Sequence, residues 1–214
     1  MSGRRVRAYI GLGANVGDAG ATLTAAVAAL AGLPGLRLRG VSRLYATDPV
    51  GVTDQAEFRN AVVALDVPAG IGHEAGAMTL LTALKDLERR AGRRRRQRWG
   101  PRELDLDLLV FGRARLAIER QPGAASIDLS SDPARAARLL VVPHAEARER
   151  LFVLAPLADL APGLVPPGWA CTVETARRRR TFVEGLDAVR AIGGWDPVNR
   201  TWRPVEAYQG PRVG

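Results

Sequence analysis

Residues 98–109 read Arg-Trp-Gly-Pro-Arg-Glu-Leu-Asp-Leu-Asp-Leu-Leu. The second half alternates leucine with acidic residues, which is the pattern of a β-strand with one buried face. On such a strand Asp105 and Asp107 project to the same side, roughly 6 to 7 Å apart along the backbone. The leucines project to the other side. The segment therefore predicts a strand that packs through its leucines and presents two carboxylates on the opposite face.

Paired carboxylates beside arginines indicate phosphate chemistry. Carboxylate oxygens are ligands that Mg²⁺ prefers, and Mg²⁺ usually keeps waters and substrate phosphates in its shell. Between Arg89 and Arg98, seven of ten residues are arginine. Such a run is more often a solvated face or a nucleic-acid contact, but this one ends directly before the carboxylate strand. A basic loop in that position is suited to closing over a polyphosphate.

The rest of the chain supplies an α+β pattern around this strand. Apolar periodicity and turn residues predict, in chain order, a strand at 7–12, a helix capped by Asp18, strands at 36–45 and 60–67, a helix over 80–91, and the carboxylate strand. A glycine-rich segment, 11–17, is expected to form the first strand-to-helix turn, with a role in shaping a substrate wall as the alternative. Strand-helix-strand-strand-helix-strand is the order of a ferredoxin-like fold. We therefore expect a ferredoxin-like antiparallel sheet sandwiched by helices in α/β/α layers.

Residues 1–167 are expected to form one domain, with a long insertion at about 113–140 that is rich in turn residues. Residues 168–214 are expected to be a C-terminal extension of unknown role, with a short helical pattern near 182–192. Trp195 and Trp202 in this extension are expected to cover part of the fold.

The composition excludes several classes of protein. The 214 residues are 47% hydrophobic and carry a net charge of +9, and the single cysteine, Cys171, rules out an internal disulfide. No stretch approaches the roughly 18 to 20 apolar residues that span a bilayer, so we expect a cytoplasmic protein that is not bound to membranes. Nearly all the basic residues are arginines, which reflects either a genome-wide bias or selection for bidentate contacts to phosphate.

Several motifs together resemble the 6-hydroxymethyl-7,8-dihydropterin pyrophosphokinase family. They are Tyr9-Ile-Gly-Leu-Gly-Ala-Asn15, Thr47-Asp-Pro-Val-Gly51, Gln55 to Asn60, Glu88, Gly92-Arg93, Arg98-Trp-Gly-Pro-Arg102, Asp105-Leu-Asp-Leu-Leu109, Val142-Pro-His144 and Arg150-Leu-Phe-Val-Leu-Ala-Pro156. The resemblance covers about residues 6–167. It implies a folate-pathway enzyme that transfers pyrophosphate from ATP to a pterin alcohol, with ATP as co-substrate and two Mg²⁺ ions.

The resemblance also implies roles for individual residues. Metal ligands are expected at Asp105 and Asp107, and catalytic arginines at Arg93, Arg95 and Arg102. Nucleotide contacts are expected at Lys85, Glu88, Leu108, His144 and Arg150. Pterin contacts are expected at Thr47, Val50, Phe58, Asn60, Trp99 and Phe152, where Trp99 and Phe152 would stack on the ring. Lys85 stands where many members of the family have glutamine.

Two other functions stay open from the residues alone. Ferredoxin-like sheets are common RNA platforms, and the arginine clusters would supply the charge for an RNA-binding module. Against this reading, aromatic residues make up only 5% of the chain. A Mg²⁺-dependent nucleotidyltransferase with another acceptor would share the carboxylates but not the pterin-pocket residues. We expect small-molecule substrates, no nucleic-acid partner and a monomer, with an oligomer left open.

Overall fold

The computed structural model describes residues 4–49, 54–92, 100–120 and 137–205. The strands are β1 (Arg5–Ala14), β2 (Arg37–Val41), β3 (Leu44–Thr47), β4 (Phe58–Pro68), β5 (Asp105–Phe111), β6 (Leu116–Glu119), β7 (Arg138–Val142), β8 (Val189–Asp196) and β9 (Thr201–Pro204). The α-helices are α1 (Ala19–Gly32), α2 (His73–Arg90), α4 (Leu151–Leu160) and α5 (Val173–Glu184), and short 3-10 turns, η1 and η2, lie at Ala147–Glu149 and Leu186–Ala188.

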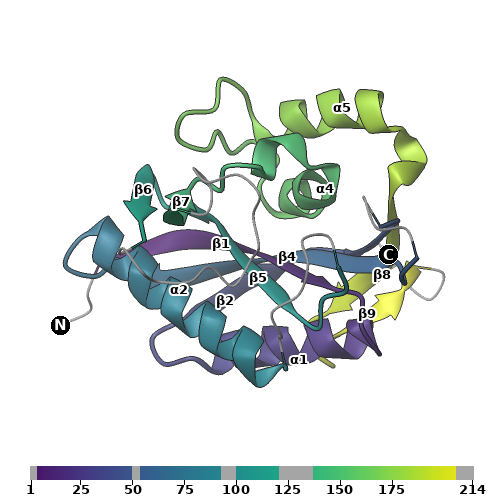
Figure 1. The fold of residues 1–214 in the computed structure, drawn as a ribbon, viewed down its shortest axis with the longest axis horizontal. Helices are drawn as coiled ribbons and strands as arrows, with labels where there is room; N and C mark the ends of the chain where they lie inside the picture. Colours follow the sequence, from purple (N-terminus) through teal and green to yellow (C-terminus); the bar gives the residue numbers. More distant parts are fainter. Residues whose placement is uncertain (1–3, 50–53, 93–99, 121–136, 206–214) are drawn as a thin grey trace, which may run out of the picture.

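A seven-stranded sheet organises the molecule (Figure 1). Its strands lie in the order β5-β1-β4-β3-β8-β9, with β2 also paired to β4, and neighbouring strands run antiparallel. β6 and β7 form a separate two-stranded sheet. The prediction of an α+β protein built on an antiparallel sheet is confirmed. None of the helices in the described part of the chain is long and apolar enough to cross a membrane.

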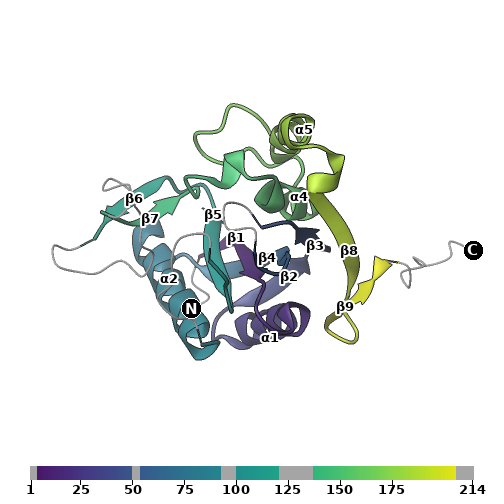
Figure 2. The same cartoon turned by 45° about the vertical axis from the view of Figure 1, so that its right-hand side comes forward.

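Helices cover both faces of the sheet. α1 and α2 lie on one face and α4 and α5 on the other, an arrangement visible in both views (Figures 1 and 2). Strand alternation divides the core accordingly: Ile10 and Leu12 of β1 pack in the cluster with α1 and α2, whereas Tyr9 packs in the cluster with α4. Because both faces are buried, the central strands read as nearly continuous apolar runs.

The first helix follows its sequence pattern closely. Asp18 caps α1, and its side chain accepts a hydrogen bond of 2.9 Å from the backbone N–H of Ala21. The apolar stripe expected from the 3.6-residue period is buried; it comprises Leu23, Ala26, Val27 and Leu30. Sequence and structure agree here because the helix has a single buried face and a defined start.

The strand predicted at 36–45 is two strands, β2 and β3, separated at Ser42. At this break the Ser42 hydroxyl accepts a hydrogen bond of 2.9 Å from the N–H of Val62, while the Ser42 N–H donates to the Val62 carbonyl at 2.9 Å. The Ser42 hydroxyl replaces a backbone acceptor at this point, so the chain bends while both the N–H and the carbonyl of Val62 keep a hydrogen-bond partner.

The glycine-rich segment 11–17 is not wholly a turn. β1 continues to Ala14, so Gly11 and Gly13 are strand residues, and the turn is confined to residues 15–18. In the expected insertion, the described residues form β6 and the start of β7; residues 121–136 lie outside the described part.

The C-terminal extension joins the same sheet rather than standing apart. α5 packs on α4, and β8 pairs with β3. The helical pattern predicted near 182–192 is wrong: α5 ends at Glu184, Gly185 takes a φ of +95°, and Val189 already begins β8. Gly185 ends the helix because this conformation strains other residues, and pairing with β3 then holds the following segment extended.

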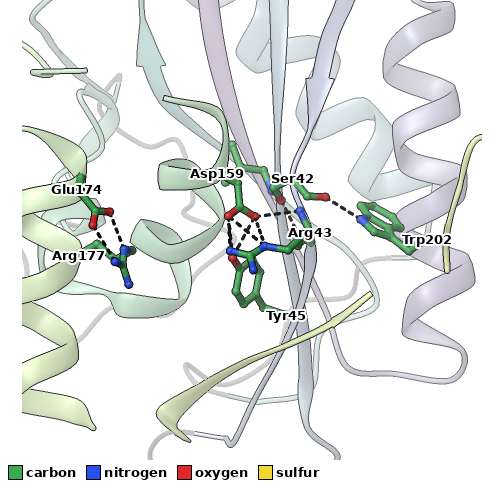
Figure 3. Close-up of polar contacts among 8 residues, drawn as sticks. Ser42, Arg43, Tyr45, Asp159, Glu174, Arg177 and Trp202 are labelled. Atoms are coloured by element: carbon green, nitrogen blue, oxygen red, sulfur yellow. Dashed lines mark hydrogen bonds and ion pairs between the residues drawn. The ribbon is translucent and has the colours of Figure 1, made fainter. Parts of the chain in front are cut away.

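Trp202 anchors the β8–β9 hairpin to the rest of the sheet. Its indole N–H donates a hydrogen bond of 2.8 Å to the Ser42 carbonyl (Figure 3). Its ring lies edge-on to Trp195, with ring centres 4.8 Å apart. Both indoles are partly buried against the main core, so they cover the fold as the sequence suggested.

Candidate active site

The two aspartates lie at the start of β5 with the geometry that their spacing predicts. Leu106 and Leu108 are buried on the α1–α2 side, 0% and 2% exposed, so Asp105 and Asp107 occupy the other face of the strand. Both carboxylates are partly exposed and share that face with α4.

The two aspartates lie opposite glycines of the neighbouring strand, of which Gly11 is covered by the Leu109 side chain and Gly13 is not. The β1–β5 register sets Asp105 opposite Gly13 and Asp107 opposite Gly11. On its other side Gly13 is paired with Asn60 of β4. A Cβ atom built on Gly13 would lie 3.5 Å from the Asn60 Oδ1 and 4.0 Å from the Asp105 Cβ. The bare backbone of Gly13 therefore forms a floor between a carboxylate and an amide that stand on either side of it.

The amide belongs to a small polar cluster on β3 and β4. Asn60 and Thr47 are each 6% exposed, and the Asn60 Nδ2 donates to the Thr47 hydroxyl oxygen at 2.9 Å. Phe58, at the start of β4, pairs with Thr47 in the β3–β4 register. Adjacent strands are about 4.8 Å apart, so Asn60 on β4 and Asp105 on β5 are separated by roughly 10 Å across the sheet.

Two further predicted residues come from the start of α4. Phe152 lies in the first turn of the helix and packs against the apolar cluster on the same face as the aspartates. The Arg150 guanidinium lies over the Phe152 ring, 5.6 Å from its centre, and forms an ion pair with Glu146. The helix start thus places an aromatic ring and a cation on the side of the candidate site.

Glu88 and Lys85 of α2 hold β5 in place from the opposite side. The Glu88 carboxylate is 1% exposed and accepts hydrogen bonds from the Leu106 N–H at 2.8 Å and from the Lys85 ammonium at 2.7 Å. Lys85 also donates to the Leu106 carbonyl at 3.3 Å. A buried carboxylate needs such partners. These contacts fix the backbone at the residue between the two aspartates.

His144 lies beside the other end of β5. Its backbone N–H donates to the Leu109 carbonyl at 2.9 Å, and its Nδ1 accepts a long hydrogen bond of 3.3 Å from the N–H of Glu146. His144 therefore follows β7 and stands next to the strand that carries the aspartates. Leu108, also predicted as a nucleotide contact, is 2% exposed, packs in the core with α1 and α2, and pairs with Ile10 of β1.

Asn15 is a residue of the site that the sequence reasoning did not single out. It is 5% exposed, and its Nδ2 donates to the Gln55 Oε1 and to the Ala56 carbonyl, both at 3.0 Å. Its Oδ1 accepts from the Arg102 N–H at 2.7 Å, and its own N–H donates to the Arg102 carbonyl at 2.9 Å. One amide thus joins the segment before Phe58 to the segment before Asp105. A polar residue directly after an apolar strand was the available signal.

Twelve of the predicted residues lie in the described part of the chain, but Lys85, Glu88 and Leu108 are on the α1–α2 side of the sheet, opposite to the two aspartates. Those placed on β3, β4, β5, α2 and the start of α4, or in the loops next to them, are Thr47, Phe58, Asn60, Lys85, Glu88, Arg102, Asp105, Asp107, Leu108, His144, Arg150 and Phe152. Four predicted residues lie outside the described part of the chain: Val50, Arg93, Arg95 and Trp99.

The carboxylates of Asp105 and Asp107 are suited to a cation that takes only part of its ligands from the protein. Among the described residues, no group of three or more histidine, cysteine, aspartate or glutamate side chains could enclose a metal ion. Two partly exposed carboxylates, one of them beside the bare backbone of Gly13, match Mg²⁺, which takes few protein ligands and completes its shell with water and phosphate oxygens. The arrangement is thus suited to metal-assisted phosphate transfer and offers no closed structural metal site within the described residues.

A second polar cluster lies on the same face of the sheet, between α4, α5, β3 and β8. The Asp159 carboxylate of α4 accepts hydrogen bonds from Arg43 and Tyr45, and Glu174 of α5 pairs with Arg177 (Figure 3). Burial raises the pKa of the Tyr45 hydroxyl, and the nearby carboxylate of Asp159 raises it further. These residues line a cavity of about 430 Å³ between α4, α5, β3 and β8. Their charges pair with one another.

Comparisons with known proteins agree on one family. The family described as 7,8-dihydro-6-hydroxymethylpterin-pyrophosphokinase (HPPK) matches residues 9–162. The 2-amino-4-hydroxy-6-hydroxymethyldihydropteridine pyrophosphokinase of Methylorubrum extorquens is 42% identical over 162 residues, which cover 76% of this chain and 87% of that protein. The protein of the same name from Pseudomonas aeruginosa is 41% identical over 161 residues, 75% of this chain and 84% of that one.

A solved structure is similar in fold. The crystal structure of Plasmodium falciparum HPPK-DHPS with pterin and p-hydroxybenzoate aligns with a TM-score of 0.69 at 13% identity and covers 96% of this chain. This chain spans 49% of that longer one.

Proposed function

The chain belongs to the 7,8-dihydro-6-hydroxymethylpterin-pyrophosphokinase family, and on that premise we propose which of its residues carry out the reaction. The enzyme is an ATP-dependent pyrophosphokinase that transfers the pyrophosphoryl group of ATP to hydroxymethyldihydropterin in folate biosynthesis. The observation that carries the residue assignment is the position of Gly13 between Asp105 and Asn60, which sets a metal-binding carboxylate and a heterocycle-binding amide on either side of one open floor.

Asp105 and Asp107 are proposed as the ligands of two Mg²⁺ ions. Their partly exposed carboxylates on one face of β5, fixed through Glu88 and Leu106, support this assignment. When bound, Mg²⁺ neutralises charge on the phosphate oxygens of ATP. The aspartates would hold the triphosphate so that its β-phosphorus faces Asn60 and the pterin.

The pterin is proposed to lie between Asn60 and the start of α4. Asn60 and Thr47 offer hydrogen-bonding groups to the amide edge of the ring, and Phe152 offers an apolar face for stacking. Phe58 pairs with Thr47 and borders the same pocket. Val50 and Trp99 complete the pocket in this proposal. The ring would then present its hydroxymethyl oxygen toward Asp105.

The transfer is proposed as a single in-line displacement. The hydroxymethyl oxygen attacks the β-phosphorus of ATP and loses its proton, the bond from that phosphorus to the oxygen bridging to the α-phosphate breaks, and AMP leaves. Positioning and electrostatic stabilisation account for the catalysis of such reactions. Arg93, Arg95 and Arg102 are proposed to stabilise the charge that develops on the phosphates. Lys85, Glu88, Leu108, His144 and Arg150 are proposed to border the nucleotide.

The finer architecture is part of the same proposal. The unit from β1 to β5 is proposed as a ferredoxin-like core, because its strands lie in the order β5-β1-β4-β3. Residues 1–167 are proposed as the pyrophosphokinase domain and 168–214 as an extension, which accords with the family match over 9–162.

The test is AMP release from ATP with and without 6-hydroxymethyl-7,8-dihydropterin, at several Mg²⁺ concentrations. Asp107→Asn should lower kcat about 100-fold or more, the effect of removing one electrostatic group from a transition state, with an unchanged melting temperature. Asp66→Asn, on β4, is the matched control, because Asp66 pairs with Arg7 and Arg39 on the surface. Wild-type turnover in Asp107→Asn would overturn the metal assignment. AMP release independent of the pterin would favour a nucleotidyltransferase with another acceptor.

A further inference from the structure

The C-terminal strand β8 reaches the proposed pterin pocket from outside the segment that matches the family. The match ends at residue 162, whereas β8 spans Val189–Asp196. β8 lies between β3 and β9, and its first half runs along β3 (Figure 2). The register sets Val189 opposite Thr47 and Arg190 opposite Ala46. The extension therefore runs beside the strand end that carries a proposed pterin-binding residue.

Arg190 bridges the two ends of the connection between β3 and β4. Its Nη2 forms an ion pair with the Glu57 carboxylate and lies 3.6 Å from the Asp48 Oδ1. Asp48 directly follows Thr47, and Glu57 directly precedes Phe58. Thr47 and Phe58 are paired across β3 and β4. One guanidinium from the extension is thus bound to the chain neighbours of both proposed pterin residues.

A second arginine completes this arrangement. The other oxygen of Glu57 accepts a hydrogen bond of 2.9 Å from Arg59 of β4. Arg59 and Arg190 flank Ala46 in the sheet register, and Ala46 is 2% exposed beneath them. Because side chains alternate along a strand, this row lies on the face opposite to Thr47 and Asn60. The Arg190 side chain therefore lies on the other face of the sheet from Thr47 and Asn60 and contacts only the chain segments next to the proposed pocket.

The exposure of these groups argues for positioning rather than stability. The side chains of Arg190 and Glu57 are 39% and 40% exposed. Exposed ion pairs contribute little to the free energy of unfolding. The arginine contacts lower the pKa of Glu57, with the hydrogen bond from Arg59 as the largest cause, so the carboxylate stays charged at neutral pH.

We propose that Arg190 is a positioning residue for the pterin: by binding Glu57 and Asp48 it holds Phe58 and Thr47 in the spacing that the pterin ring requires. The inference rests on the proposed assignment of Thr47 and Phe58 to the pterin pocket. It gives the β8–β9 extension a function in substrate binding in addition to covering the edge of the sheet.

The test is steady-state kinetics of Arg190→Ala with each substrate varied in turn. The KM for the pterin should rise about two- to fivefold, a range set by the strength of exposed ion pairs, while the KM for ATP, kcat and the melting temperature stay at wild-type values. Arg190→Lys should recover part of the loss, because it keeps one charge but not the forked geometry. Arg203→Ala is the matched control, since Arg203 pairs with Asp196 within the hairpin at 2.6 Å; it should behave as wild type.

Glu57→Gln removes the carboxylate that binds Arg190 and should raise the KM for the pterin in the same way. This variant keeps the inference testable if Arg190→Ala folds poorly. An unchanged KM for the pterin in both variants would overturn the inference. A parallel rise in both KM values together with a lower melting temperature would also overturn it, because that is the signature of a structural role. If instead the proposed function were wrong, the wild-type enzyme itself would release no AMP in response to the pterin. That result separates failure of the proposed function from failure of the inference about Arg190.

Discussion

At the scale of single residues, Gly13 matters because it has no side chain at the position between Asp105 and Asn60, the proposed metal ligand and the proposed pterin-binding residue. Its position between Asp105 and Asn60 is opened only because no side chain projects there. A glycine inside a strand weakens the strand, since it adds flexibility and no packing. The local cost is therefore offset by the space that two substrates need.

Gly13→Ala tests this directly. The added Cβ would meet the Asn60 Oδ1 at 3.5 Å and the Asp105 Cβ at 4.0 Å, which are ordinary contacts, so the variant should fold with an equal or higher melting temperature. The methyl group would occupy the floor of the site, and kcat/KM for the pterin should fall about tenfold, the size expected from misplacing reacting groups by a fraction of an ångström. Gly32→Ala, where a Cβ meets nothing within 4 Å, is the control. Full activity in Gly13→Ala would contradict the shared floor.

Asn15 shows the opposite case, a residue that acts through what it binds. Asn15→Ala would remove the hydrogen bonds that Asn15 makes with the Arg102 N–H and the Ala56 carbonyl, both partly buried. A hydrogen bond contributes about 0.5 to 1.5 kcal/mol net, so we expect the free energy of unfolding, measured in urea, to fall by about 1 to 3 kcal/mol. Asn15→Asp keeps the acceptor for Arg102 but loses the donors to Gln55 and Ala56. Because the lost contacts hold the segment before Phe58, this variant should raise the KM for the pterin more than the KM for ATP. Equal changes in both KM values would contradict the proposal that this segment positions pterin-binding residues.

At the scale of elements, the sequence predicted best those segments whose residues alone set their conformation. The leucine–aspartate alternation of β5 and the buried stripe of α1 were both predicted, because strand pleat and helix period determine which side chains are buried. The prediction of a helix near 182–192 was wrong, because Gly185 and pairing with β3 determine the conformation there. Neither effect can be seen in the spacing of apolar residues along the sequence. The candidate site followed the same rule: spacing predicted that Asp105 and Asp107 share one face of β5, whereas the contacts of Asn15 depend on which loops meet.

The start of α5 provides a prediction on pH. Hydrogen bonds from Arg177 and then Arg178 lower the pKa of the Glu174 carboxylate to about 2, against 4.5 for the free group. A depressed pKa in the folded state means that the stabilisation is present above about pH 4.5 and is lost as the pH falls toward 2. Glu174→Gln should therefore melt below wild type at pH 7, and the gap should close over that interval. Glu184→Gln, which removes a carboxylate from the same helix, controls for net charge. A gap as large at pH 2.5 as at pH 7 would contradict the assignment.

At the scale of the whole molecule, one sheet holds all parts of the site in register. β5 carries the proposed metal ligands, β1 carries Gly13, β4 and β3 carry proposed pterin-binding residues, and β8 carries the arginine proposed to position them. The extension is built into the same sheet through β8 and through the hydrogen bond from Trp202 to Ser42 (Figure 3). Substrate binding at the site should thus stabilise the chain as a single unit.

Ligand-dependent melting measures that coupling. A ligand that binds only the folded state at about 100 times its Kd adds about 2.7 kcal/mol to the free energy of unfolding, so a non-hydrolysable ATP analogue with Mg²⁺ should raise the melting temperature by several degrees. Chelating the metal should abolish most of this increase, because phosphates facing Asp105 and Asp107 without a cation between them repel the carboxylates. Asp107→Asn should reduce the Mg²⁺-dependent increase while retaining the wild-type melting temperature without ligand. An increase of the same size in the presence of chelator would mean that the nucleotide binds without the two aspartates and their metal.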